Sequence, residues 1–390
     1  MKIAIYSHSI PSSLFIENLI EGLAQRGFKV YLFGKKLEEK SYGKNIFVKS
    51  TPKGNWAINW FIFGQSLLLF VRNPMVLIKT YRLVFSKNRM GIVQTKLSCF
   101  LPILNNPVDI FHFQWGNDLT KHQELFTLLK CDIFVSMRGS HFTYAPVFRK
   151  PLSDAYRTYF PKVKKFHAVS ESMRQNGEKW GAAPERITAI YSSIPDRLIG
   201  MFKPFNRSIE SPVKIVSIGR FHWVKGYNYA LEAVHLLKQK GVQVKYTLVA
   251  NENVPEELLY AIHSLGLSRE VAIVNGLPHE ETINLLQTQD ILLMCSVAEG
   301  LANVVLEAMA VGIPVISTDC GGMAEVMKDG ETGLLIPIRN PEAIAKAISN
   351  MQAMPAAELS QLTKKAHQAI LQKHTLGNML NRFEKLYKNP

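Results

Sequence analysis

The stretch that decides the fold of this chain is AEGLANVVLEAMAVGIPVIST, residues 298–318. Its pattern is typical of a loop, a helix, a stop and a strand. Asn303 can cap a helix that runs through Met309. Gly312 can end this helix, and Pro314 prevents its continuation before a β-branched run. The stretch therefore predicts one helix-to-strand step of an α/β sheet.

Two carboxylates frame the start of this helix. Gly300 places Glu299 in the loop just before the helix, whereas Glu307 projects from its first turns. The helix N-terminus between them offers free N–H groups and a partial positive charge, which suit a phosphate. A nucleotide-sugar can lie across that end. The alternative is that both glutamates are ordinary solvated side chains on the protein surface.

The same alternation of strand and helix runs through the rest of the chain. Strand patterns occupy residues 2–6, 29–33, 108–113, 132–137, 166–169 and 187–191, and then 214–218, 245–249, 271–274, 290–294, 314–318 and 333–336. Segments of this kind separated by helices predict parallel sheets with covering helices, which is the α/β class.

The length of 390 residues exceeds what one ordinary core supports and fits two domains. The pattern weakens into a linker between residues 195 and 212. We therefore expect a first domain over residues 1–200 and a second over 201–375. Residues 376–390 form a C-terminal helix that can pack back on the first domain.

Composition marks a folded protein, with 47% hydrophobic and 20% charged residues. The four cysteines show neither CxxC nor metal-ligand spacing, so we expect no disulfide framework, no zinc site and a reducing, cytoplasmic setting. The apolar run after Met1 is too short for a signal peptide and reads as a first strand.

The net positive charge of the chain comes entirely from its first half. Residues 1–200 hold 28 Lys+Arg against 13 Asp+Glu, whereas residues 201–390 hold 18 of each. Between residues 40 and 108 there are ten basic residues, no acidic one and many aromatic ones, a segment we call the basic aromatic segment. No nucleic-acid-binding motif accompanies it, so we expect no nucleic-acid partner and favour binding to anionic lipid head groups.

Residues 58–71 are too short and too polar to span a bilayer. They can lie on one, or they form a core helix with a solvated basic face.

A second charged motif follows strand 214–218. Gly219 and Arg220 end the strand, and Lys225 and Gly226 come just before a helix. Two cations beside a helix N-terminus suit a diphosphate, although they can also be solvated loop residues. The motif is no GxGxxG fingerprint, so no nicotinamide cofactor is indicated.

Taken together, these motifs resemble the donor-binding domain of family 4 retaining glycosyltransferases (glycosyl transferases group 1). The resemblance covers about residues 213–350. Within the family, the chain is similar in character to the bacterial members that build exopolysaccharide, capsule and O-antigen. The motifs are Gly219-Arg220, Lys225-Gly226, Glu299-Gly300, Glu307 to Ala310, Gly312 to Val315 and Gly321-Gly322 with Glu325. The resemblance implies the GT-B fold, in which two Rossmann-like domains with parallel sheets face each other across a cleft.

The resemblance also implies roles for residues of the second domain. Arg220 and Lys225 would bind the donor diphosphate, Glu299 would hold hydroxyls of the transferred sugar, and Glu307 would bind the ribose. Further donor contacts are expected from Leu301, from Asn303 with its neighbouring amides, and from the loop that begins at Gly276.

The first domain matches less closely. His112 lies in a segment that resembles the strand ending in a histidine, although it can equally be a packed histidine. Many members place a histidine beside the donor sugar after the strand corresponding to residues 132–137, where this chain has Arg138 and, three residues on, His141. The candidate catalytic residues are therefore Glu299, Arg138, His141 and His112.

The function implied is that of a retaining hexosyltransferase. It would move a sugar from a UDP- or GDP-sugar to a saccharide or polyprenyl-linked saccharide in cell-surface polysaccharide biosynthesis, with no metal or other cofactor. It would be cytoplasmic and peripheral on the inner face of the plasma membrane. Two other possibilities are a nucleotide-sugar epimerase of the same architecture and a catalytically degenerate glycan-binding relative.

Overall fold

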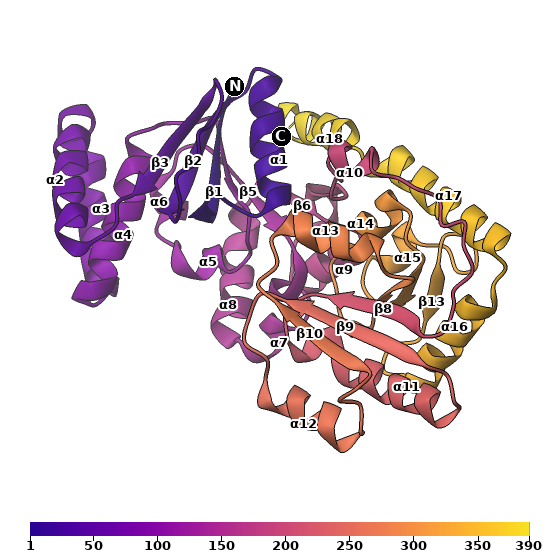
Figure 1. The fold of residues 1–390 in the computed structure, drawn as a ribbon. Helices are drawn as coiled ribbons and strands as arrows, with labels where there is room; N and C mark the ends of the chain where they lie inside the picture. Colours follow the sequence, from indigo (N-terminus) through magenta and orange to yellow (C-terminus); the bar gives the residue numbers. More distant parts are fainter. Residues whose placement is uncertain (390) are drawn as a thin grey trace. The chain divides into compact units, whose positions relative to one another are not determined.

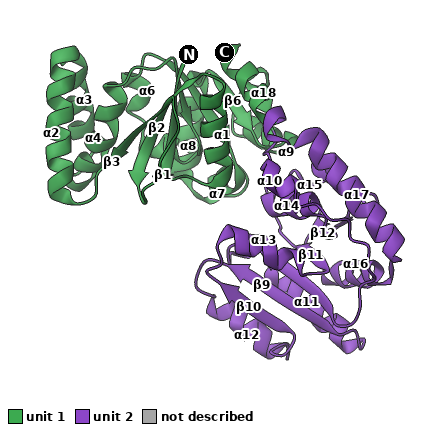
Figure 2. Ribbon diagram, turned by 45° about the horizontal axis from the view of Figure 1, so that its top comes forward, with its two compact units in different colours: residues 1–190, 379–390 green, residues 191–378 purple. Residues whose placement is uncertain are grey.

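The computed structural model describes residues 1–389, apart from the side chain of Lys87. The chain forms two compact units (Figure 2). Unit 1 comprises residues 1–190 and the end of the chain from Met379, and unit 2 comprises residues 191–378. Each unit contains one parallel sheet with helices against it, so the α/β class predicted from the sequence is confirmed (Figure 1).

The sheet of unit 1 has seven parallel strands in the order β3-β2-β1-β4-β5-β6-β7. They are β1 (Lys2–Ile10), β2 (Lys29–Lys36), β3 (Ile46–Thr51), β4 (Ile110–Phe113), β5 (Asp132–Met137), β6 (Lys165–Ala168) and β7 (Ile187–Ala189). The helices are α1 (Leu14–Gln25), α2 (Asn55–Arg72), α3 (Pro74–Lys87), α4 (Met90–Leu104), α5 (Asp118–Lys121), α6 (Leu125–Leu128), α7 (Ala145–Phe148), α8 (Lys150–Tyr159) and α9 (Glu171–Lys179), with short 3₁₀ turns at Gly139–His141, Phe160–Lys162 and Pro184–Arg186.

The sheet of unit 2 has six parallel strands in the order β10-β9-β8-β11-β12-β13. They are β8 (Val213–Ile218), β9 (Val244–Ala250), β10 (Val271–Asn275), β11 (Ile291–Met294), β12 (Val315–Thr318) and β13 (Leu334–Ile336). The helices are α10 (Asp196–Ile199), α11 (Tyr227–Gln239), α12 (Glu256–Ser264), α13 (His279–Gln287), α14 (Asn303–Val311), α15 (Met323–Val326), α16 (Pro341–Ala353) and α17 (Ala356–Lys373), with a 3₁₀ turn at Trp223–Lys225.

Unit 2 has a hydrophobic core on each face of its sheet. Successive residues of one strand belong to different cores, since Ile215 packs on one face and Val216 on the other. Leu292 and Leu293 of β11 divide in the same way. Both faces are therefore buried, which explains why these strands read as continuous apolar runs and not as alternating ones.

The stretch at residues 298–318 folds as loop, helix and strand, with one correction. Gly312 ends α14 in the left-handed conformation, at φ +91°, and a side chain there would collide with the carbonyl oxygen of Lys203. The residue at the N-cap is Ala302, and Asn303 is the first helical residue. The predicted Asn303 cap is therefore wrong, because Ala302 takes the extended backbone that a capping residue needs.

The structure of the basic aromatic segment agrees with only one of the two interpretations of residues 58–71. It forms β3 and then three helices, α2, α3 and α4, which stand together in Figure 1. Leu69 is the one buried side chain of α2, whereas Trp56 is 77% exposed and Phe63 61% exposed. The interpretation of residues 58–71 as a core helix is therefore wrong. None of the helices in residues 1–389 is long and apolar enough to cross a membrane.

The C-terminal helix α18 (Leu376–Lys388) returns the chain to unit 1. Its Glu384 accepts a hydrogen bond at 2.9 Å from Arg26, the residue that follows α1, and its Tyr387 hydroxyl lies 2.7 Å from His112 Nδ1 of β4. Leu380 occupies the space beside Gly22, where any side chain would collide with it. The last turns of the chain therefore complete the core of the first unit.

Candidate functional site

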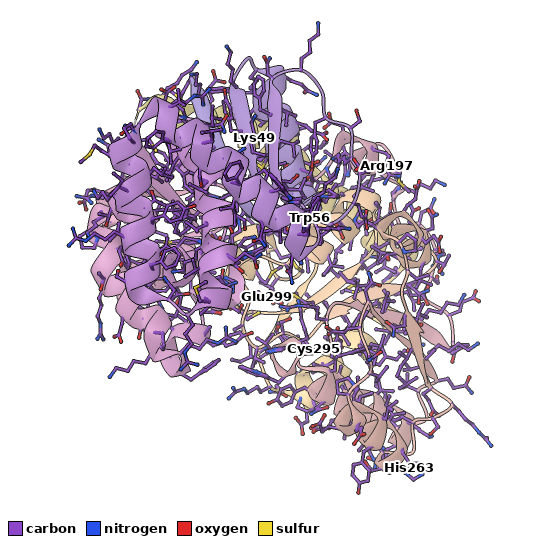
Figure 3. The ribbon with its side chains drawn as sticks, turned by 90° about the vertical axis from the view of Figure 1, so that its left-hand side faces the viewer. Lys49, Trp56, Arg197, His263, Cys295 and Glu299 are labelled. Atoms are coloured by element: carbon purple, nitrogen blue, oxygen red, sulfur yellow. The ribbon has the colours of Figure 1, made fainter. Side chains whose placement is uncertain are left out.

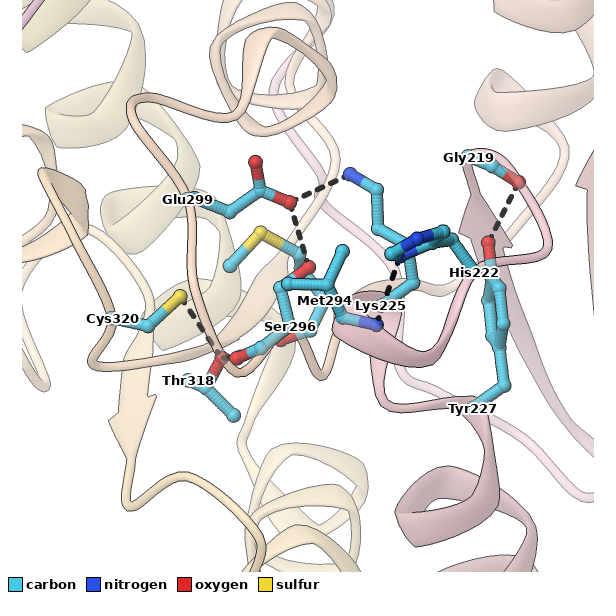
Figure 4. Close-up of polar contacts among 10 residues, drawn as sticks. Gly219, His222, Lys225, Tyr227, Met294, Ser296, Glu299, Thr318 and Cys320 are labelled. Atoms are coloured by element: carbon cyan, nitrogen blue, oxygen red, sulfur yellow. Dashed lines mark hydrogen bonds and ion pairs between the residues drawn. The ribbon is translucent and has the colours of Figure 1, made fainter. Parts of the chain in front are cut away.

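The predicted donor residues of unit 2 meet at the carboxyl ends of β8, β11 and β12. Lys225 Nζ lies 2.6 Å from Glu299 Oε1, and the Ser296 hydroxyl donates to the same oxygen at 2.8 Å (Figure 4). Lys225 and Glu299 are 20% and 15% exposed. The cation and the carboxylate that the sequence assigned to separate parts of a donor are thus directly paired in the free protein.

Glycines allow these segments to approach one another. Gly226 has φ +67°, and a side chain there would collide with the carbonyl oxygen of Cys295. Gly321 has φ +59°, and a side chain there would collide with the carbonyl oxygen of Glu299. The Gly322 amide also donates to the Gly300 carbonyl at 3.1 Å. Motifs separated by up to about a hundred residues therefore form one continuous backbone cluster at the sheet edge.

Glu307 lies on the first turns of α14 and pairs with His279, the first residue of α13. His279 Nε2 is 2.9 Å from Glu307 Oε1, and this hydrogen bond raises the pKa of His279 above its ordinary value. At the start of the same helix, Asn303 Oδ1 is buried and has no hydrogen-bond partner among the described residues. Asn303 therefore offers an acceptor that a ligand hydroxyl can use.

The remaining predicted donor residues border open space. The Arg220 side chain is exposed just beyond β8, after Gly219, whose carbonyl accepts from the Tyr227 hydroxyl at 2.8 Å. Gly276 has φ +75°, and a side chain there would meet no atom within 4 Å. Leu301 is half-buried in the loop before α14. Solvent can therefore reach the positions predicted for the base and the diphosphate.

A pocket of about 610 Å³ adjoins this cluster. Of the predicted motif residues it contains only Gly226, and its wall has several aromatic rings, two carboxylates and one guanidinium, that of Arg339. Its lining includes Phe221, His222, Trp223, Tyr227, Tyr229, Glu232 and Glu257. We place the candidate site at the Lys225–Glu299 pair and not in this pocket, because acidic walls disfavour a diphosphate whereas cations and a helix N-terminus favour it.

In unit 1, Arg138 and His141 follow β5 and meet Gln114 and Trp115, which follow β4. Arg138 is 8% exposed, and its guanidinium lies 4.5 Å from the centre of the Phe15 ring. Burial lowers the pKa of Arg138 to about 9. The His141 and Trp115 rings meet edge to face at 6.0 Å. The structure thus brings both candidates together at one edge of the first sheet.

His112 belongs to a buried chain of hydrogen bonds. Its Nδ1 lies 2.7 Å from the Tyr387 hydroxyl and its Nε2 lies 2.9 Å from the Ser136 hydroxyl. Ser136 also lies 2.8 Å from Nδ1 of His167. Burial, with a smaller contribution from Arg138, lowers the pKa of His112 to about 3. Both ring nitrogens are engaged inside unit 1, which favours the packed alternative, and the catalytic assignment of His112 stays a prediction.

Sequence reasoning missed a second polar pair at the same sheet edge. His8 Nε2 lies 3.2 Å from Asp118 Oδ1, and Asp118 is completely buried. Burial raises the pKa of Asp118 well above its ordinary value, and burial also lowers the pKa of His8. The signal was present, because His8 lies at the end of the first apolar strand pattern, where α/β sheets bind ligands. In residues 1–389, no three His, Cys, Asp or Glu side chains gather as metal ligands do.

Unit 2 contains a region that matches a known protein family. Residues 202–369 match the family model "Glycosyl transferases group 1". This part of the chain is a glycosyl transferases group 1 domain.

Curated relatives resemble the chain over part of their length. The amylovoran biosynthesis glycosyltransferase AmsK of Erwinia amylovora is 33% identical over 61% of this chain and 60% of its own. The lipopolysaccharide core biosynthesis glycosyltransferase LpsE of Rhizobium meliloti is 32% identical over 42% of this chain and 45% of its own. The match thus spans about half the length of these relatives.

A likeness in fold extends beyond this domain to both units of the chain. The crystal structure of Anabaena HepE in complex with UDP and glucose covers 100% of both chains at a TM-score of 0.69 and 16% identity. At this identity the likeness establishes the fold alone, which is the two-domain GT-B fold. The recognition of the family and the GT-B fold predicted from the sequence are confirmed.

Proposed function

We propose that the protein is a retaining hexosyltransferase that moves a sugar from a UDP- or GDP-sugar to a saccharide or lipid-linked saccharide. The observation that carries this proposal is the convergence of Lys225, Glu299 and the start of α14 at one sheet edge. The relatives named for amylovoran and lipopolysaccharide core biosynthesis support a place in cell-surface polysaccharide assembly.

The reaction would exchange one bond for another at the anomeric carbon of the donor. The bond from this carbon to the β-phosphate oxygen breaks, and a bond to the acceptor oxygen forms on the same face. The acceptor proton passes to the leaving phosphate oxygen. Lys225, Arg220 and the amides at the start of α14 would stabilise the negative charge that develops on that oxygen, and this lowers the barrier. The proposal assigns no step to a metal.

Glu299 would orient the sugar and would not act as a nucleophile. Its Oε1 is held by both Lys225 and Ser296, whereas Oε2 has no partner among the described residues. A carboxylate fixed in this way can accept hydrogen bonds from sugar hydroxyls through Oε2. Glu307 would accept from the ribose in the same manner.

Lys225 provides the direct test of this assignment. Replacing it by Ala removes a charge from the leaving group, so we expect transfer to fall about 10²- to 10³-fold. Release of UDP or GDP from a panel of nucleotide-sugars, with product analysis, measures the loss. Lys328→Ala is the matched control, since Lys328 is an exposed lysine of the same unit. Wild-type rates in Lys225→Ala would overturn the assignment, and release of a free epimerised sugar would show an epimerase.

Contact with an anionic membrane is the second part of the proposal. Trp56, Trp60, Phe63, Leu67 and Phe70, spaced by four, three, four and three residues, form one exposed stripe along α2, which we call the α2 stripe. Rings within it meet edge to face at about 6 Å, as Trp56 does with Trp60 and Trp60 with Phe63. Figure 3 looks onto this side of unit 1, with Trp56 labelled. An exposed aromatic stripe of this kind is typical of a helix that lies in a membrane interface.

The positive charge of the basic aromatic segment favours an anionic membrane as the partner of the α2 stripe. The basic aromatic segment contains no acidic residue, and exposed Arg82 and Arg89 accompany the α2 stripe. Anionic head groups attract such cations while acyl chains accept the aromatic rings. This arrangement supports a peripheral enzyme on the inner face of the plasma membrane and an acceptor carried on a polyprenyl lipid.

A further inference from the structure

Two side chains of unit 1 that contact each other, Gln114 and Arg138, each have a buried N–H donor without an acceptor among the described residues. Gln114 is completely buried and accepts a hydrogen bond from Arg138 Nη2 through its Oε1 at 3.3 Å. Its amide nitrogen, Nε2, has no partner among the described residues, and neither does Arg138 Nε. Buried donors are normally paired, so both nitrogens are available to a group that the free protein does not supply.

Arg138 also lacks a counter-ion. In the part of the chain that the structure describes, no carboxylate lies within 4 Å of its guanidinium nitrogens, and its one hydrogen-bond partner is the neutral Gln114. The Phe15 ring below the guanidinium compensates only in part, since a cation over an aromatic face contributes about 0.5–2 kcal/mol. A buried unpaired charge costs more than that. Stability alone therefore does not explain Arg138 at this position.

The surroundings leave room for a ligand. Gly139 follows Arg138 with φ +48°, and a side chain there would meet no atom within 4 Å. Half-buried rings of Phe15, Trp115 and His141 border the same place, each meeting the next at 6.0 Å. Aromatic walls around a few convergent polar groups are typical of a small-molecule site.

We propose that Arg138 and Gln114 bind the anionic group of a carbohydrate substrate, a carboxylate or a phosphate, at the carboxyl ends of β4 and β5. The guanidinium fork matches two oxygens of such a group, and the Gln114 amide donates to one of them. The substrate class is then an acidic sugar, either a uronic acid or a sugar phosphate. The carbohydrate part of this inference rests on the proposed function, whereas the anion site rests on the two orphaned donors alone.

Thermal unfolding with small anions tests the site directly. Glucuronate represents the carboxylate and glucose 6-phosphate the phosphate, with glucose as the neutral reference. We expect one of the two anions to stabilise the wild type more than glucose does. Arg138→Gln should weaken its binding at least about tenfold, because a charged hydrogen bond is lost. Arg149→Gln is the matched control, since Arg149 is an exposed arginine that also lies over a ring, that of Phe148.

A second variant separates binding from folding. Gln114→Glu places a permanent carboxylate beside Arg138, so the protein should unfold at a higher temperature and the anion should no longer stabilise it. If Arg138 had only a structural role, Gln114→Glu would raise the unfolding temperature but would not change the stabilisation by the anion. Equal anion shifts in the wild type, Arg138→Gln and Gln114→Glu would overturn the proposal. UDP- and GDP-sugars run in parallel report on the proposed function separately, because their diphosphate site lies in unit 2.

Discussion

Under the proposed function, the Lys225–Glu299 pair would affect how a donor enters the site of unit 2. In the free protein the ammonium group already has a carboxylate partner at 2.6 Å, so an arriving diphosphate must compete with Glu299 for it. Ser296 donates to the same carboxylate oxygen at 2.8 Å, so it would keep Glu299 in place if Lys225 turned toward a phosphate. The pair therefore holds the Glu299 carboxylate in position. It also gives Lys225 a counter-ion in the free protein, so that neither charge is unpaired before a donor binds.

His279 should report on occupancy of the ribose position through its pKa. The hydrogen bond to Glu307 raises this pKa, so the pair stabilises the folded state fully below about pH 6.5, the unfolded value. The stabilisation is lost as pH rises through the higher folded value. Glu307→Gln should lower the His279 pKa, and so should bound UDP if its ribose engages Glu307. Titration of the His279 ring protons by NMR measures both shifts.

Neighbouring charges set the controls for that titration. Arg197 lowers the His279 pKa and Glu280 raises it, both less than Glu307 does. Glu280→Gln should therefore give a smaller decrease than Glu307→Gln. An unchanged His279 pKa in the presence of saturating UDP would contradict contact between Glu307 and the ribose.

Single residues were predictable where backbone chemistry constrained them. Glycines next to charged side chains at strand ends identified Lys225 and Glu299 as neighbours of a helix start, but spacing along the chain carried no information that they touch. The sequence left His112 open between packing and catalysis, because burial of a strand histidine depends on what covers the strand, here Tyr387 of α18. Asp118 gave no signal, since a carboxylate on a short helix normally faces solvent.

The turn between β8 and α11 depends on Gly226 for close packing. Gly226→Ala combines a left-handed backbone with a collision against the Cys295 carbonyl, whereas Gly330→Ala, at φ +70°, meets no atom within 4 Å. We expect Gly330→Ala to cost about 1–2 kcal/mol from backbone conformation alone. Gly226→Ala should cost about 1–3 kcal/mol more, since overpacking adds to it. Chemical denaturation measures both, and equal losses would contradict the close approach of β8 and β11.

The α2 stripe should determine binding to vesicles. Replacing Trp56, Trp60 and Phe63 together by Ser removes apolar area that would enter the interface, so the bound fraction on anionic vesicles should fall about tenfold or more. Co-sedimentation measures it. All three side chains are exposed, so the melting temperature should change little.

Two controls accompany the vesicle experiment. Tyr260→Ser removes an aromatic side chain that is 73% exposed on α12 of unit 2, and it should leave binding unchanged. Neutral vesicles should bind the wild type weakly, because the cations of the basic aromatic segment then have no counter-charge. Wild-type binding by the triple variant would exclude the α2 stripe as the membrane contact.

Elements were predictable where apolar runs were continuous. All the strands expected from the sequence are present, with ends that differ by a few residues. β3 was missed because this edge strand is half exposed and carries Lys49 among its apolar residues, which hides its pattern. The exposure of α2 could not be predicted, since its apolar residues occupy more than one face and only the packing of α3 and α4 shows which face stays open.

Two domains were expected from the chain length and from the weak pattern between residues 195 and 212, whereas the two compact units divide between Ile190 and Tyr191. For the C-terminal helix, the sequence indicated that it can pack on the first domain but did not exclude the second. An amphipathic pattern shows that α18 buries one face, but both sheets of an α/β protein offer apolar surfaces to cover. Contacts of Phe383 and Tyr387 with His112 and His167 show that the partner is unit 1.

Removal of one α18 side chain should therefore loosen unit 1 and leave unit 2 intact. Tyr387→Ala creates a cavity beside β4 and β5 and leaves His112 Nδ1 unpaired, so we expect a cost of about 3–5 kcal/mol. Hydrogen exchange should accelerate in β4, β5 and β6, while β8, β9 and β11 keep their protection, because Tyr387 packs within unit 1. Tyr260→Ala is the control, since that tyrosine is exposed in unit 2. Equal acceleration in both sheets would show that the units unfold as one, and no acceleration in β4 would mean that α18 does not complete the first core.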